Sequence, residues 1–465
     1  MWRAGVGLGV FVVAAGAGVL VPAAARADTM RGALTQAYQN NPQLNAQRAA
    51  VRVTDESVPQ ALSGYRPRIS LSASVAEQYL DSLSKSSPTN SHSSGAIAVQ
   101  TYGGTITQNI LNGNATASRT RLAEQQVSSA RETLRLSEQT VLLAAATAYM
   151  NLIRDAAILS LQRSNVEVLQ EQLRQTQDRF QVGEVTRTDV AQSESRLAAA
   201  RAQMLTAESN YNTSRSTYRQ VIGVEPGRLE PASPVDRLSP GNLQQGVAIA
   251  RARHPSVTVA MFNVDAAVFQ VKIAESSLYP SLNVVGQAQK GYGSAQSLNT
   301  LESFSASIAG QLTVPVYQGG SEYATIRAAK ETMQQRRIDL DTARDQAQQT
   351  LVQTWGQLEA AKAQVQATQT QVNAAEIALN GVREEARVGQ RTTLDVLNAQ
   401  QELVNARVSL VTAQRDRVVG SYTLLSASGG LSAMVLALPV QIYDPTVHYH
   451  QVRDTWVGVR TPDGK

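Results

Sequence analysis

The sequence predicts an α+β membrane protein made of two copies of a unit that runs helix, strand, strand, long helix, helix. This prediction rests on an internal repeat along the chain, on segments where apolar and polar residues alternate, and on two proline-free stretches with a seven-residue apolar repeat. Of the 465 residues, only 5% are aromatic. Such a composition favours long, thinly packed helices over a large globular core.

Residues 1–27 predict a secretory signal peptide. Arg3 precedes an apolar stretch at 4–21, and the small-residue motif at 25–27 has the form of a cleavage site. The mature chain is therefore expected outside the cytoplasm. Beyond this signal we expect no membrane-spanning helix, because the longest apolar run, 431–440, is about half of the roughly 20 residues that such a helix needs.

Composition excludes several kinds of site. The chain has no cysteine, so disulfides, thiolate zinc sites and cysteine nucleophiles are excluded. The formal net charge is +5, but the basic residues alternate with acidic residues and glutamine, which predicts solvated helix faces and no nucleic-acid partner. His448 and His450 lie in a predicted loop without a third ligand, so we expect no metal there and no cofactor elsewhere.

The internal repeat sets the domain organisation. Asn41 and Pro42 correspond to His254 and Pro255, and the dipeptide at 182–183 recurs at 388–389. Four segments follow the signal: a first structural repeat at 28–223, a proline-rich equatorial linker at 224–241, a second repeat at 242–428, and a carboxy-terminal equatorial segment at 429–465.

Each repeat begins with a helix and a pair of strands. The helices are predicted at about 29–63 and 243–277, before Pro67 and Pro280. A two-residue alternation of apolar and polar side chains then predicts four strands, at about 68–79, 96–110, 281–292 and 303–317. Serine, proline and asparagine predict a loop at 81–95 between the first two strands, and a shorter loop lies near Gly293.

Long helices complete each repeat. They are predicted at about 114–181 and 320–387, and return helices at about 187–223 and 393–428 show the same seven-residue spacing. Both turns are therefore expected to be tips of helical hairpins. A helix of this length measures about 100 Å, far more than the thickness of a bilayer.

The strands predict how the chain enters a membrane. Each is long enough to supply the 9 to 11 residues that a lipid-exposed strand needs, with one apolar and one polar face. Four strands cannot close a barrel, and open sheet edges are not tolerated in lipid. We therefore expect several chains to share one barrel of at least about eight strands.

The hairpin tips carry a resemblance to a known family. The tip motifs are Arg-Phe-Gln-Val-Gly at 179–183, leading to Thr-Arg-Thr-Asp-Val at 186–190, and Arg-Val-Gly-Gln-Arg-Thr-Thr-Leu-Asp-Val-Leu-Asn-Ala at 387–399. With the duplicated architecture, they make the chain similar to the TolC-like outer membrane efflux proteins of Gram-negative bacteria. The stretch at 438–445 and Trp456 resemble the type I secretion members.

The resemblance implies a homotrimer whose 12 strands form one barrel in the lipid of the outer membrane, continued by a long periplasmic α-helical barrel. It also implies docking onto a periplasmic adaptor protein that is joined to an inner-membrane ABC or proton-driven transporter. Such a channel passes secreted proteins or small toxic compounds and catalyses no reaction.

Two readings apply to the acidic residues of the tips. Asp189 and Asp395 each follow a threonine by three positions, at Thr186 and Thr392, which predicts capping boxes at the starts of two helices. The resemblance instead implies a periplasmic gate, whose residues would be Asp189, Arg391, Asp395 and Asn398.

Within this implied gate, Arg391 would tie the inner hairpin to Asp189 of the outer one. Ala386 stands where the family has a tyrosine, so this lock should be weaker than in other members. The resemblance also implies that residues 395 and 398 form two rings around the periplasmic constriction. Asn398 makes the second ring an amide, which leaves only three copies of Asp395 to attract cations.

The tip glycines predict left-handed helix ends, and the same exposed surface is where the adaptor would dock. The expected tip and docking residues are Val182, Gly183, Thr188, Val388, Gly389 and Leu394.

Competing function classes explain less of the sequence. A periplasmic or secreted structural coiled coil without a pore leaves the repeated strand pairs unexplained, and a self-inserting toxin has no need for two equivalent tips. No Walker A motif or catalytic triad is present, so we do not expect an enzyme. Protein secretion and drug efflux both stay open as transport functions.

Overall fold

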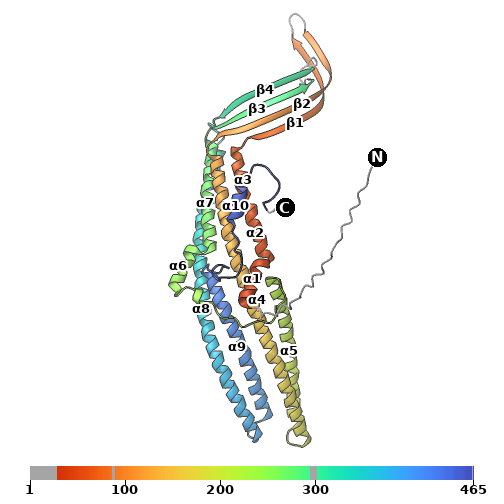
Figure 1. Ribbon diagram of the computed structural model, residues 1–465, viewed down its shortest axis with the longest axis vertical. Coiled ribbons are helices and arrows are strands. Elements are labelled where there is room, and N and C mark those ends of the chain that lie inside the picture. Colours follow the sequence, from red (N-terminus) through yellow and green to blue (C-terminus); the bar gives the residue numbers. More distant parts are fainter. Residues whose placement is uncertain (1–28, 86–89, 294–300, 463, 465) are drawn as a thin grey trace, which may run out of the picture.

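A computed structural model describes residues 29–85, 90–293, 301–462 and 464, and shows one elongated molecule. A sheet lies at one end and two helical hairpins reach the other (Figure 1). This is the α+β architecture that the sequence predicts. The signal peptide predicted at 1–27 and the middles of both strand-connecting loops lie outside the described residues.

The amino-terminal helix of each repeat is interrupted. The described elements are α1 (Met30–Asn40), α2 (Pro42–Asp55), α3 (Ser57–Leu62), α6 (Leu243–Arg253) and α7 (Pro255–Glu275). Our expectation of single helices at 29–63 and 243–277 was therefore wrong. Pro42 and Pro255 lack the backbone N–H that an uninterrupted helix needs. Asn41 and His254 cap the new helix starts by accepting from the amides of Gln43 and Ser256.

The four strands form one antiparallel sheet in the order β1-β2-β3-β4. Their bounds are β1 (Arg68–Lys85), β2 (Asn90–Asn112), β3 (Ser281–Tyr292) and β4 (Glu302–Thr313). The first pair extends through most of the segment predicted as a loop at 81–95, because ladder hydrogen bonds need only the backbone. The last strand ends earlier than the predicted residue 317, because Pro315 cannot donate to a ladder.

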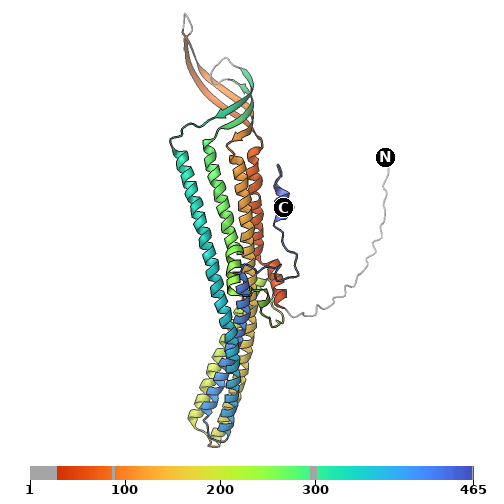
Figure 2. The ribbon, with the colours of Figure 1, turned by 90° about the vertical axis from the view of Figure 1, so that its left-hand side faces the viewer.

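Two long helices run down from the sheet. They are α4 (Ala115–Gln181) and α8 (Ser321–Arg387), each 67 residues and about 100 Å long. Their lower halves pair with the return helices α5 (Arg187–Ile222) and α9 (Thr393–Ala427), which gives the two hairpins (Figures 1 and 2). Nearer the sheet, α7 packs against both long helices.

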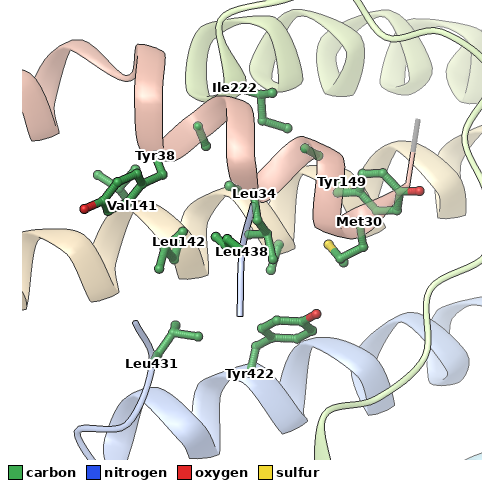
Figure 3. Close-up of a cluster of buried hydrophobic side chains, with 14 of the residues drawn as sticks. Met30, Leu34, Tyr38, Val141, Leu142, Tyr149, Ile222, Tyr422, Leu431 and Leu438 are labelled. Carbon is green, nitrogen blue, oxygen red and sulfur yellow. The ribbon is translucent and has the colours of Figure 1, made fainter. Parts of the chain in front are cut away.

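The largest apolar cluster lies where the hairpins begin. Figure 3 shows Leu34 of α1 and Leu142 of α4 close to Leu431 and Leu438 from the segment after α9. The proline-rich linker also contacts this level, since Arg417 of α9 forms a bidentate ion pair with Asp236. Both segments that we expected at an equator thus meet around one core. This core fixes the hairpins to the upper helices.

One expectation about membrane helices needs correction. Two described helical stretches, Ala115–Gln181 and Leu243–Leu278, contain an 18-residue window that is apolar and long enough to cross a membrane, judged by length and composition only. Our expectation that no stretch after the signal is long and apolar enough for such a helix was therefore wrong. Half of the first window is buried inside the protein, as in a core helix that packs on its neighbours. Composition thus does not assign either helix to lipid.

Candidate functional site at the hairpin tips

The two hairpins end in turns of the same design. Gly183 and Gly389 have φ angles of 81° and 79°, in the left-handed region that glycine adopts without steric cost. The next residues close each turn, because the amide of Glu184 donates to Arg179 O at 2.9 Å and the amide of Gln390 donates to Glu385 O at 2.9 Å. These bonds satisfy carbonyl groups that a helix end leaves free.

Capping boxes begin both return helices, as the sequence predicts. The amide of Asp189 donates to Thr186 Oγ1 at 3.3 Å, and the Thr186 amide donates to Asp189 Oδ2 at 2.9 Å. Asp395 and Thr392 repeat these bonds at 3.2 and 3.0 Å. Hydrogen bonds from the threonines hold the pKa of both aspartate carboxyls below their ordinary value. Both carboxylates therefore stay charged at neutral pH.

Arg391 has a different partner from the one that the family resemblance implies. Its Nε lies 2.8 Å from Glu385 Oε2 on its own hairpin, and this ion pair raises the pKa of the guanidinium. Asp189 is held in its capping box. Both side chains nevertheless line one open hollow of about 820 Å³ between the two tips. Within one chain, the expected contact across the hairpins is thus replaced by a pair inside the second hairpin.

Asn398 joins the hairpins instead. Its Oδ1 accepts a hydrogen bond of 2.7 Å from Arg196 Nη2, which comes from α5 of the other hairpin. Sequence reasoning missed Arg196. Its position seven residues after Asp189, on the same helix face, was the available signal.

Leu397 is the second residue that sequence reasoning missed. It lies on α9 but packs into the first hairpin, in a cluster with Leu169 of α4 and with Leu197 and Ala200 of α5. Only 2% of its surface is exposed. An apolar side chain thus crosses from one hairpin to the other, next to the Arg196–Asn398 bond.

Between Leu397 and the largest apolar cluster, hydrogen bonds between polar side chains also join the two hairpins. Arg415 Nε donates to Asn151 Oδ1 at 2.8 Å, and Gln400 Nε2 donates to Asn165 Oδ1 at 3.5 Å. Within the second hairpin, by contrast, α8 and α9 share buried apolar side chains such as Leu379. Each hairpin is therefore more firmly packed within itself than against the other hairpin.

The expected docking residues lie on the outside of the tips. Val182 and Val388 are 72% and 70% exposed, and Thr188 is exposed as well. Leu394 is 37% exposed. A Cβ built at either tip glycine would meet nothing within 4 Å. The tips therefore present small apolar surfaces around open turns.

The predicted histidine loop is a helix, so that expectation was wrong. His448 and His450 lie in α10 (Thr446–Val452), and His448 Nδ1 lies 3.0 Å from Asp55 Oδ2. Among the described residues, no group of three His, Cys, Asp or Glu side chains could hold a metal ion.

Comparisons with known proteins agree with this architecture. The chain is 40% identical over 453 residues to the outer membrane efflux protein BepC of Brucella suis, which covers 96% of this chain and 95% of that protein. It is 25% identical to the outer membrane protein TolC of Escherichia coli, over 88% of this chain and 83% of that protein. The crystal structure of the CmeC outer membrane channel of Campylobacter jejuni shares the fold, with a TM-score of 0.76 at 16% identity over 91% of this chain and 89% of that one.

The family assignment extends over both repeats. Residues 33–224 and 247–430 match the outer membrane efflux protein family. These ranges contain both long helices, both return helices and all four strands. The chain belongs to the outer membrane efflux protein family.

Proposed function

We propose that three copies of this chain form one export duct, in which twelve strands close a barrel in the outer membrane and the helices continue it as a periplasmic tunnel. The open sheet carries this proposal. Its outer strands β1 and β4 expose Leu71, Phe304 and Ile308. Exposed apolar side chains and unpaired edges suit a strand that pairs with a sister chain in lipid.

The duct supplies passage, and energy comes from its partners. We propose that the tips dock onto a periplasmic adaptor that is joined to an inner-membrane ABC or proton-driven transporter. The exposed Val182 and Val388 support this site, because they sit beside open turns that a partner helix can approach. The protein needs no cofactor for this role and catalyses no reaction.

A strain that lacks this protein distinguishes two classes of cargo, small toxic compounds and secreted proteins. BepC is named an efflux protein, which favours small toxic compounds. The resemblance of 438–445 to type I secretion members favours a secreted protein. Sensitivity to dyes and bile salts in the deletion strain supports efflux, whereas retention of a secreted protein inside the cells supports secretion. If the deletion strain shows neither defect although its adaptors are intact, the export function is contradicted.

We further propose that the tips form the gate. Leu397 and the Arg196–Asn398 bond hold the second hairpin against the first. The assembled trimer adds a contact between Arg391 and Asp189, which both line the hollow between the tips. Three copies of Asp395 then line the constriction and favour cations.

Conductance in planar bilayers tests the gate. Arg196→Ala and Arg391→Ser should each raise conductance, because each removes a link between hairpins. Glu402→Ala is the matched control, since Glu402 occupies in α9 the place of Arg196 in α5 and is exposed. Asp395→Asn should lower selectivity for cations without raising conductance. Unchanged conductance in both arginine variants would contradict the gate while leaving the duct intact.

A further inference from the structure

The carboxy-terminal segment leaves the equatorial core and is fixed to the upper helices. Asp55 of α2 is fully buried, and its carboxylate lies 3.0 Å from His448 Nδ1 of α10. The Arg131 guanidinium of α4 lies 3.9 Å from the same carboxylate and 5.0 Å from the ring centroid of Tyr449. Removing the partner of a buried charged group strongly destabilises the folded protein. This contact therefore holds α10 in place. It also sets the direction of the chain that follows.

That following chain reaches the foot of the sheet (Figure 2). Arg66 Nη1 donates to Thr455 O at 2.7 Å, and the guanidinium lies 4.7 Å from the ring centroid of Trp456. Arg66 precedes the first residue of β1, Arg68, by two positions. Trp456 is therefore held beside the start of a strand, although 388 positions separate it from Arg68 in the sequence.

The side chains after this contact are apolar and uncovered. Trp456 is 67% exposed, Val457 88% and Val459 100%. Such a cluster is costly to leave in water. Arg66 and Arg460 flank it with positive charge.

Three exposed tyrosines mark the same level of the molecule. Tyr65 precedes β1, Tyr279 precedes β3 and Tyr317 follows β4, so all lie at the foot of the sheet. Aromatic residues gather where a membrane protein meets the interface between lipid and water. Trp456 extends this row of aromatic side chains outside the sheet.

We infer that Trp456, Val457 and Val459 form a membrane-contact patch that rests on the periplasmic leaflet of the outer membrane. Its occupant is phospholipid. The patch continues the tyrosine row at the foot of the sheet, and arginine side chains next to it can reach lipid phosphates while indole rings favour the headgroup region. This contact goes beyond the proposed export function, because conduction does not require it.

Tryptophan fluorescence in vesicles tests this contact. Of the three tryptophans, Trp2 lies in the predicted signal, and Trp355 lies on α8 about 50 Å from the helix start at Ser321. In the Trp355→Phe protein the signal therefore reports Trp456. We expect phospholipids that carry bromine near the headgroup to quench this emission, and more strongly than phospholipids with bromine near the chain ends. In the matched control, Trp456→Phe, bromine-labelled phospholipids should leave the emission of Trp355 unchanged.

The outcomes separate the possible occupants. Trp456 emission that bromine-labelled lipids leave unchanged, in vesicles that conduct ions, would overturn the lipid contact and leave the channel standing. If that emission is also shielded from iodide in detergent-solubilised trimers, a sister subunit covers the patch. Removal of the holding contact by Arg66→Ala in the Trp355→Phe protein should reduce the quenching. Absence of conductance together with normal quenching would contradict the export function and keep the lipid contact.

Discussion

The tips of the first and second hairpins share a backbone but differ in the side chains around it. Both have a left-handed glycine, at Gly183 and Gly389, and both start the return helix with a capping box. Position by position, however, Leu397 of the second tip stands where the first has Ala191, which is exposed. Duplication has thus kept what closes a tip and changed what joins one hairpin to the other.

Charge is also exchanged between the tips. Arg179 in the last turn of α4 pairs with Glu184 in the turn at 2.9 Å. The position equivalent to Arg179 in α8 holds Glu385, which pairs with Arg391 of its own turn at 2.8 Å. Each tip thus has a local ion pair of opposite polarity, although Arg391 lies one position later in its turn than Glu184 does in the first. A partner that binds both tips would therefore contact two turns with the same backbone shape but different arrangements of charged side chains.

The largest effect is expected from Leu397→Ala. Removing a buried leucine costs about 2 to 5 kcal/mol, and here the lost contacts hold the two hairpins together. Single-channel conductance should rise. The matched variant is Leu403→Ala, which removes an equally buried leucine from contacts inside the second hairpin. It should lower the melting temperature without opening the channel. Equal conductance in the two variants would refute the claim that contacts between the hairpins, and not those within the second hairpin, keep the channel closed.

Much of the fold was predictable because it depends on local patterns. The two-residue alternation predicted the strands, and the seven-residue repeat with the tip glycines predicted both hairpins and their turns. Threonine followed three positions later by aspartate predicted the capping boxes. The breaks at Asn41 and His254 were missed, because the helix periodicity was weighted above the proline that follows each of them.

The contacts between hairpins were not predictable in the same way. A stripe of leucines shows that a helix buries one face, but not which helix covers it. Leu397 therefore fits a stripe equally well whether it packs on α8 or on α4 and α5. The bond between Arg196 and Asn398 joins residues 202 positions apart, and the sequence places neither opposite the other. Such pairings follow from the three-dimensional arrangement of the hairpins.

A smaller and equal effect is expected from the caps. Thr186→Ala and Thr392→Ala each remove the side chain that accepts from an aspartate amide, at a cost of about 0.5 to 2 kcal/mol. Hydrogen exchange at 183–190 and 389–396 should speed up to a similar extent in the two variants. Loss of protection at only one tip would show that the shared backbone does not behave as two equivalent units.

Acid should weaken both caps within the same pH window. Because folding lowers the pKa of Asp189 and Asp395 below 3.8, ionisation of these carboxyls stabilises the folded tips. This stabilisation is complete above the ordinary pKa and is lost as pH falls through the lowered one. Helical circular dichroism during titration below about pH 4 should show the loss. In the double variant Thr186→Ala and Thr392→Ala this dependence should be flatter, and an unchanged titration would contradict the assignment.

The exchanged charges should give the smallest effects, and these should have opposite signs. A cation in the last turn of a helix is stabilising and an anion is destabilising, by about 0.3 to 1 kcal/mol at low salt. Arg179→Gln should therefore speed hydrogen exchange at the end of α4, whereas Glu385→Gln should slow it at the end of α8. In 1 M salt, where the Debye length is about 3 Å, both changes should shrink. A slowing that persists at high salt would mean that packing, and not charge, distinguishes the two tips.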